Sequence, residues 1–170
     1  ILAAAQKKKY AVGSFTVWNI DIIRAVVETA EELHAPAIVM FGPVEMDDNG
    51  KYGLKTLSDI ALAYIHRAKV PIALHFDHST STGLLKEVIK HGFSSVMFDG
   101  SRLAYKENIV STRQVVQMAK KRGISVEGEI GKVPGLEGAP GYGDDKIHKG
   151  EDIYTNPAQA QEFADKTGVD

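Results

Sequence analysis

The strongest chemical signal in this sequence is a short polar cluster at the end of an apolar run. The stretch "ALHFDHST" (73–80) places His75, Asp77 and His78 within four consecutive positions. A strand that only needs to be buried has no use for such residues. A neutral imidazole is a good zinc ligand, and a carboxylate beside a metal-bound substrate can act as a general acid or base. The cluster therefore predicts a metal-dependent reaction site, the alternative being that one histidine caps a helix and the aspartate caps the next one.

The alternation of side chains along a strand places His75 and Asp77 on one face. His78 is expected just past the end of the strand, where the chain turns and the alternation can lapse. The three residues therefore need not point in one direction, and they can serve separate chemical roles.

Further carboxylates lie near the ends of two other predicted strands. Glu127 and Glu129, in "VEGEIG" (126–131), share a face of a predicted buried strand. Burial of two like charges is costly unless a cation or hydrogen-bond donors compensate, although the end of this strand could instead be solvated. Asp99 ends another predicted strand in "MFDGS" and could simply cap a turn. Together with His75 and Glu129, however, it would give one ligand from each of three neighbouring strands, as a divalent ion could use.

A long loop follows the last of these strands. Six of the sixteen glycines of the chain lie within residues 131–150, together with two prolines. Such a loop inside a compact domain is usually functional or disordered. Glu137 lies in its middle, where a carboxylate could act as a general base that enters the site only with substrate bound. The alternative is a flexible surface loop in which the glutamate is incidental.

The chain alternates short apolar segments with longer amphipathic ones, which predicts strands and helices in turn. Strands are expected at residues 10–17, 36–42, 70–76, 94–100 and 124–130. Helices are expected at residues 20–33, 56–68, 82–92, 103–122 and 155–168, with a short helix before Lys9. Thr56 is expected to begin the helix at 56–68. Asn156 or Thr155 is expected to begin the helix at 155–168, with Pro157 in its first turn and Gly168 as its C-terminal cap. This alternation predicts an α/β fold with a parallel sheet covered by helices.

Two parallel architectures fit this pattern, an open doubly wound sheet and a (β/α)8 barrel. No glycine-rich fingerprint follows the first strand, which weakens the dinucleotide-binding form of the open sheet. Polar residues instead gather where strands end, and in a barrel these ends converge on one mouth. A barrel usually takes about 250 residues, and five strands cannot close one. We therefore expect residues 1–170 to form a single domain, the N-terminal portion of a (β/α)8 TIM barrel with about its first five βα units.

The composition narrows the class of protein further. The net charge of −2 gives no reason to expect a nucleic-acid partner or an anionic membrane. No apolar stretch approaches the roughly 20 residues needed to span a bilayer. The chain has no cysteine, which excludes disulfides and thiolate metal sites and is compatible with a reducing cytosol. We expect a cytoplasmic protein without membrane or nucleic-acid partners.

Several motifs, in this order and spacing, resemble class II fructose-bisphosphate and tagatose-bisphosphate aldolases. They are "YAVGSF", "ALHFDHST", "GFSSVMFDGS", "SVEGEIGKVPGLEG", and "IYTNP" followed by "FADKTGVD". The resemblance runs from about Lys9 to Asp170. It implies a zinc-dependent (β/α)8 barrel, a homodimer or homotetramer, acting in carbohydrate metabolism. The implied reaction cleaves a ketose 1,6-bisphosphate to dihydroxyacetone phosphate and glyceraldehyde 3-phosphate.

The same resemblance implies roles for individual residues. His78 corresponds to a catalytic zinc ligand, and Asp77 to the residue that exchanges a proton with the C4 oxygen. Glu137 corresponds to the loop glutamate that removes the proton when the enediolate forms. A second, peripheral divalent or monovalent cation would be held by His75, Asp99 and Glu129. The other zinc histidines and the phosphate-binding loops of the family are expected after Asp170.

The sequence departs from the family pattern in two places. "FTVWN" (15–19) stands where the family commonly has an asparagine-rich turn, and Pro134 and Gly138 replace a usual glycine and acidic residue. These departures leave two alternatives open. The protein could be a divergent paralogue that acts on another phosphorylated ketose, or a non-catalytic barrel that serves as a binding or regulatory subunit.

Overall fold

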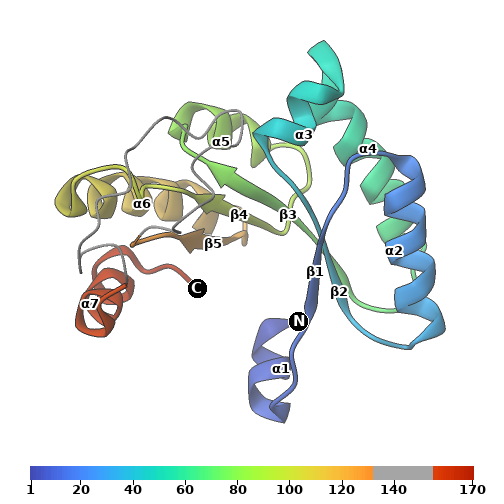
Figure 1. The fold of residues 1–170 in the computed structure, drawn as a ribbon, viewed down its shortest axis with the longest axis horizontal. Helices are drawn as coiled ribbons and strands as arrows, with labels where there is room; N and C mark the ends of the chain where they lie inside the picture. The colour runs from blue at the N-terminus through green and yellow to red at the C-terminus, as the bar shows by residue number, and fades with distance from the viewer. Residues whose placement is uncertain (132–154) are drawn as a thin grey trace, which may run out of the picture.

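The computed structural model describes residues 1–131 and 155–170, and the centre of this described part is a parallel sheet (Figure 1). Its strands are β1 (Gly13–Thr16), β2 (Ala37–Phe41), β3 (Ile72–Ser79), β4 (Ser95–Phe98) and β5 (Ser125–Gly128). The helices are α1 (Leu2–Lys8), α2 (Ile20–Glu32), α3 (Pro43–Asp48), the 3-10 turn η1 (Gly50–Tyr52), α4 (Gly53–Ile65), α5 (Thr82–Val88), α6 (Tyr105–Lys120) and α7 (Pro157–Thr167).

The strands lie in the sheet in the order in which they occur along the chain, β1-β2-β3-β4-β5, and all neighbouring pairs are parallel. A doubly wound sheet reverses its strand order at a switch point, whereas a barrel adds each strand beside the previous one. The predicted α/β class and the five successive βα units are therefore confirmed. The strand order favours the barrel over the doubly wound alternative.

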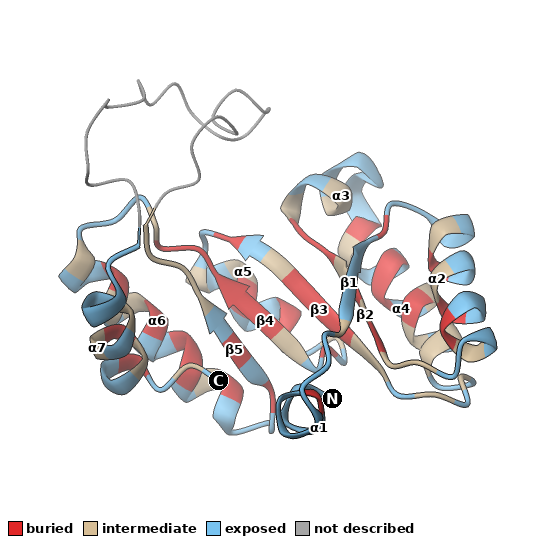
Figure 2. Ribbon diagram, turned by 60° about the horizontal axis from the view of Figure 1, so that its bottom comes forward, coloured by how far each residue is buried: buried red, intermediate tan, exposed pale blue. Residues whose placement is uncertain are grey.

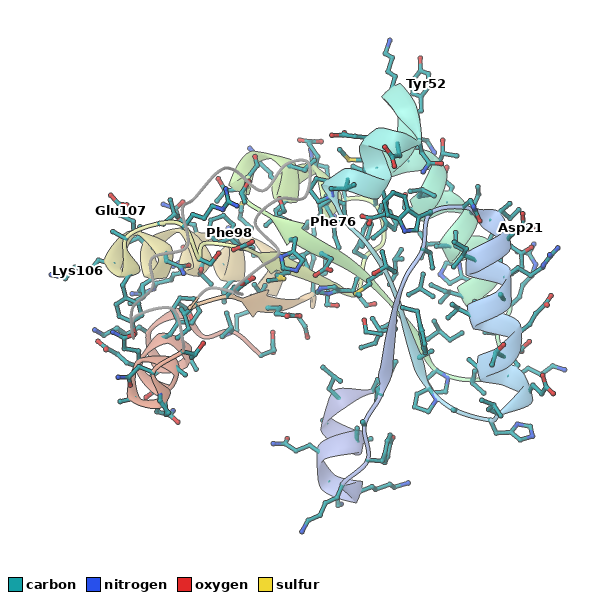
Figure 3. The ribbon with its side chains drawn as sticks, viewed as in Figure 1. Asp21, Tyr52, Phe76, Phe98, Lys106 and Glu107 are labelled. Atoms are coloured by element: carbon teal, nitrogen blue, oxygen red, sulfur yellow. The ribbon has the colours of Figure 1, made fainter. Side chains whose placement is uncertain are left out.

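The two faces of the sheet differ in chemistry. Phe41, Phe76, Val96 and Val126 lie in register across four strands, and all four belong to the buried core that the sheet shares with the helices. Phe41, Phe76 and Phe93 contact one another edge to face, with ring centroids 5.4–5.7 Å apart. Figure 2 shows buried residues along β3 and β4 and on the facing sides of the helices, whereas β1 is exposed. In Figure 3, Phe76 and Phe98 lie within the body of the molecule, while Tyr52 lies at its periphery.

The opposite face carries a more polar row. Met40, His75, Ser95 and Ser125 lie in register on neighbouring strands, one residue before the apolar row. Because alternate residues of a strand point to opposite faces, this row points away from the helix-covered core. His75 thus lies on the face opposite to Phe76.

Most of the predicted elements are present, and the region after β2 is the main difference. Helix α3 and the η1 turn, residues 43–52, were not expected from the sequence. The backbone N–H of Gly42 donates to the Glu45 side chain at 2.8 Å, and Pro43 occupies the first turn of α3. Helix α4 then begins at Gly53, so the expectation that Thr56 opens it is wrong.

The last helix follows the sequence signals closely. The Asn156 side chain accepts hydrogen bonds from the N–H groups of Ala158 and Gln159, and Pro157 lies in the first turn of α7. Gly168 ends the helix in the left-handed region, with φ of 72°. Among the helices of the described ranges, none is long and apolar enough to cross a membrane.

Candidate functional site

Strand β3 contains one extra residue where the polar cluster lies. Phe76 pairs with Val96, and Ser79 pairs with Phe98, so three steps along β3 match two steps along β4. His78 lies within this bulge and has φ of 44°, a left-handed conformation that is uncommon for residues other than glycine. Bulges of this kind redirect a side chain and are frequent beside active sites. His78 therefore lies inside the strand and not past its end, and its redirection comes from the bulge.

The bulge brings His78 to carboxylates of the two following strand ends. Its Nδ1 lies 3.3 Å from Asp99 Oδ2 and 3.6 Å from Glu129 Oε2. The other oxygen of Asp99, Oδ1, accepts hydrogen bonds from the Ser101 N–H at 3.0 Å and the Ser101 hydroxyl at 2.6 Å. Asp99 thus has one oxygen anchored and the other directed at His78. We call His78, Asp99 and Glu129 the metal-candidate cluster.

The metal-candidate cluster fits a divalent ion. One potential ligand atom from each residue lies within 4.8 Å of the others. Metal–ligand bonds of about 2.0–2.5 Å place ligands on opposite sides of an ion about 4–5 Å apart. Glu129 Oε2 is buried and has no hydrogen-bond partner among the residues that the structure describes. A buried, unpartnered carboxylate oxygen beside an imidazole and a second carboxylate is what a bound cation would satisfy.

The charges of this cluster depend strongly on one another. The hydrogen bond to Asp99, together with the negative charges of Asp77 and Glu129, raises the pKa of His78 to about 9. Burial alone would raise the pKa of Asp99, but its hydrogen bonds with His78 and Ser101 lower it to about 2. Burial and the nearby charge of Asp99 raise the pKa of Glu129 above its ordinary value. Without a metal, a protonated His78 therefore provides the positive charge in this cluster.

His75 and Asp77 lie in a second group, beside the metal-candidate cluster. The buried His75 ring places Nδ1 2.7 Å from the Ser95 hydroxyl. Its Nε2 lies 3.7 Å from Asp77 Oδ1 and 3.6 Å from Glu127 Oε2. The structure thus brings Asp99 and Glu129 together with His78, while His75 contacts Asp77 and Glu127.

Asp77 has the properties of a carboxylate held in its ionised form. Burial alone would raise its pKa, but the contact with His75 and the positive charge of His78 outweigh burial and lower the pKa below its ordinary value. Its side chain is 22% exposed. It is therefore partly exposed at the ends of the strands and ionised near neutral pH.

Sequence analysis did not identify Asn108, which supports this site from helix α6. The buried Asn108 amide donates to the Glu129 carbonyl at 2.7 Å and accepts from the Thr112 hydroxyl at 2.9 Å. A Cβ on Gly100 would lie 2.1 Å from Asn108 Oδ1, so only glycine allows this approach. The available signal was an asparagine on the buried face of a helix, at helical spacing from Thr112, Val115 and Ala119.

Glu137, the predicted loop base, lies outside the described residues. Its assignment stays a prediction from the sequence.

Comparison with known proteins agrees with this fold. The family model described as "Fructose-bisphosphate aldolase class-II" matches residues 1–170. Among solved structures, the YdjI aldolase from Escherichia coli K12 is 32% identical, with a TM-score of 0.82 over 99% of this chain and 57% of its own. A Coccidioides immitis protein, provisionally assigned as a fructose-1,6-biphosphate aldolase, is 29% identical with a TM-score of 0.83, over 99% of this chain and 56% of its own.

A third structure, the fructose-bisphosphate aldolase from Campylobacter jejuni, is 23% identical with a TM-score of 0.72, over 98% of this chain and 51% of its own. At that identity the likeness concerns the fold alone. The chain therefore spans a little over half the length of each of these structures. Because the family model matches all of its residues, this chain belongs to the class II fructose-bisphosphate aldolase family.

Proposed function

We propose that the protein carrying this chain is a metal-dependent aldolase that cleaves a ketose 1,6-bisphosphate, fructose or tagatose, to dihydroxyacetone phosphate and glyceraldehyde 3-phosphate. One observation carries the proposal: the metal-candidate cluster converges beside the ionised Asp77 at the ends of β3, β4 and β5. In folds of this type, active sites are built at the carboxyl ends of the strands. Membership of the aldolase family supports the class of reaction.

The proposed cofactor is Zn2+, with His78 as one of its ligands. Asp99 and Glu129 are proposed to hold the same ion or a second cation beside it, because both have an oxygen directed at His78. His75 is proposed as a further ligand of a peripheral cation only where Nδ1 leaves Ser95 or Nε2 loses its proton, since these are its two ring nitrogens. A bound zinc ion would supply Lewis-acid polarisation of the ketone carbonyl of the substrate.

Asp77 is proposed to carry the proton of the carbon–carbon cleavage. It accepts the proton of the C4 hydroxyl as the C3–C4 bond breaks, and the bonding electrons pass to the ketone half as an enediolate. In the reverse direction Asp77 returns this proton to the aldehyde oxygen. Its lowered pKa keeps it ionised near neutral pH, as the cleavage direction requires. Glu137 is proposed to exchange the carbon-bound proton of the dihydroxyacetone phosphate half.

The proposed function is tested with the full-length protein and a panel of phosphorylated ketoses. We expect the zinc-loaded protein to cleave fructose or tagatose 1,6-bisphosphate, as measured by the release of glyceraldehyde 3-phosphate. Chelation lowers the rate more than about a hundredfold, since a Lewis acid contributes several kcal/mol, and added zinc restores it. Cleavage of only another phosphorylated ketose would favour the divergent paralogue. A zinc-loaded protein that cleaves no member of the panel would contradict the proposal.

Metal binding is expected to depend on pH through His78. A metal-bound imidazole must be neutral, whereas His78 in the metal-free protein has a raised pKa of about 9. Binding therefore releases about one proton, and the apparent affinity rises about tenfold per pH unit between about pH 6 and 8. Calorimetric titration with Co2+ in buffers of different ionisation enthalpy measures the number of protons released. The same titration at several pH values measures the slope of the affinity. The His66→Ala variant, altered at an exposed position after α4, should keep the wild-type slope. A flat affinity profile in the wild type would contradict the displacement of a proton from His78 by the ion.

The remaining assignments belong to the same proposal. A homodimer or homotetramer, acting on sugar phosphates in the cytoplasm, is what membership of this family favours. Sedimentation of the full-length protein measures the oligomeric state directly.

A further inference from the structure

The Ser95 hydroxyl makes a contact that the pairing of the strands does not require. Ser95 lies directly opposite His75 in the β3–β4 register, and its Oγ is 2.7 Å from His75 Nδ1. The neighbouring Ser94 makes backbone contacts instead: its hydroxyl accepts from the Leu74 N–H at 2.9 Å and donates to the Leu74 carbonyl at 3.0 Å. The side chain of Ser94 thus supports the sheet, and the side chain of Ser95 holds the imidazole ring.

The far side of the same ring faces two carboxylates. His75 Nε2 is buried and, within residues 1–131 and 155–170, has no partner at hydrogen-bond distance. Its nearest acidic atoms are Asp77 Oδ1 at 3.7 Å and Glu127 Oε2 at 3.6 Å. Ionised carboxylates only accept hydrogen bonds, whereas a serine hydroxyl can donate or accept. In a neutral ring, the arrangement that suits both sides has the proton on Nε2 and a Ser95 hydroxyl that donates to Nδ1.

We propose that Ser95 is a positioning residue for the cleavage reaction: it fixes the His75 ring with its Nε2–H between Asp77 and Glu127, and so holds Asp77 in place. This inference rests on the proposed function, because Asp77 carries the proton there. The chain of contacts is short, from Ser95 Oγ to His75 Nδ1 and from His75 Nε2 to Asp77 Oδ1. Without the hydroxyl, Nδ1 loses its hydrogen-bond partner and the ring loses the contact that fixes its rotation, so Asp77 loses its fixed neighbour.

The test compares Ser95→Ala, Ser95→Thr and the matched control Ser94→Ala in the full-length, zinc-loaded protein. Nitrogen-15 NMR of labelled histidine reads the tautomer, with the His75 signals assigned by their absence in His75→Gln. We expect the Nε2–H tautomer in every variant, because Asp77 and Glu127 only accept hydrogen bonds. The Nδ1 resonance of Ser95→Ala should be shifted from its value in the wild type and in Ser94→Ala, because Nδ1 no longer accepts a hydrogen bond from the hydroxyl. Ser95→Thr keeps a hydroxyl and should restore the wild-type signature.

Kinetics provide the second measurement. Ser95→Ala should lower kcat for cleavage about threefold to tenfold, since one hydrogen bond contributes about 0.5–1.5 kcal/mol. KM and zinc content should change less than about twofold. A wild-type ring protonated at Nδ1 or at both nitrogens, or a Ser95→Ala variant with an unchanged Nδ1 resonance and unchanged kcat, overturns the proposal. The NMR result decides the positioning of His75 even if the protein cleaves no ketose bisphosphate, so the two proposals fail separately.

Discussion

Replacing Asp77 by asparagine should lower kcat for ketose-bisphosphate cleavage about a thousandfold, within the range of 10²–10⁴ that is typical for loss of a general acid or base. The amide has the shape of the carboxylate but cannot accept the C4 proton. Because Asp77 is partly exposed and is not a member of the metal-candidate cluster, the variant should still fold and bind zinc. Steady-state kinetics, zinc analysis and thermal unfolding of the full-length protein measure these three properties.

The expected loss is large because, within the part of the chain that the structure describes, neither His75 nor Glu127 is placed to replace Asp77. The buried His75 Nε2 is expected to carry a proton already, and the Glu127 side chain is 61% exposed to water. A matched control is Asp59→Asn, which removes an exposed aspartate that pairs with Lys55 on helix α4. The control should retain wild-type activity. If Asp77→Asn kept more than about a tenth of the wild-type kcat with zinc bound, Asp77 would not be the proton carrier.

The sequence was sufficient to predict the elements whose signals are local. The alternation of residues in β3 separated His75 and Asp77 from Phe76, because side chains on a strand alternate between faces. Asn156, Pro157 and Gly168 determined both ends of α7 through the hydrogen bonds and backbone angles of the helix termini. In these cases one segment contains all the information that decides the structure.

The features that could not be predicted depend on two or more segments. The bulge that redirects His78 is defined only by comparing β3 with β4, and nothing within "HFDHS" alone requires it. His78 therefore appeared at first to follow the strand, and Asp99 and Glu129 were grouped with His75. The support of Glu129 by Asn108 likewise depends on the approach of α6 to β5 and on Gly100. Helix α3 was missed because its first turn uses a Gly-Pro pair, which equally predicts a turn.

Replacing His78 should abolish tight zinc binding and, with it, cleavage, whichever small residue takes its place. His78→Ala and His78→Gly both remove the imidazole, so the zinc content and kcat of the full-length protein should fall to those of the chelated wild type. In the metal-free protein both changes also remove the positive charge between Asp99 and Glu129. Burial of the two carboxylates without that charge should lower the free energy of unfolding.

The two His78 variants differ in their backbones, and this difference separates folding from function. His78 has φ of 44°, which costs an alanine about 1 kcal/mol or more but costs a glycine little. His78→Gly should therefore be more stable than His78→Ala by about 1 kcal/mol while being equally inactive. His34 is a matched control, since it is exposed, has φ of 51° and precedes β2 at the opposite end of the sheet. His34→Gly should show the same gain in the free energy of unfolding over His34→Ala, and both His34 variants should keep zinc and activity. If activity instead followed stability, with His78→Gly partly active and His78→Ala inactive, His78 would serve the fold and not the metal.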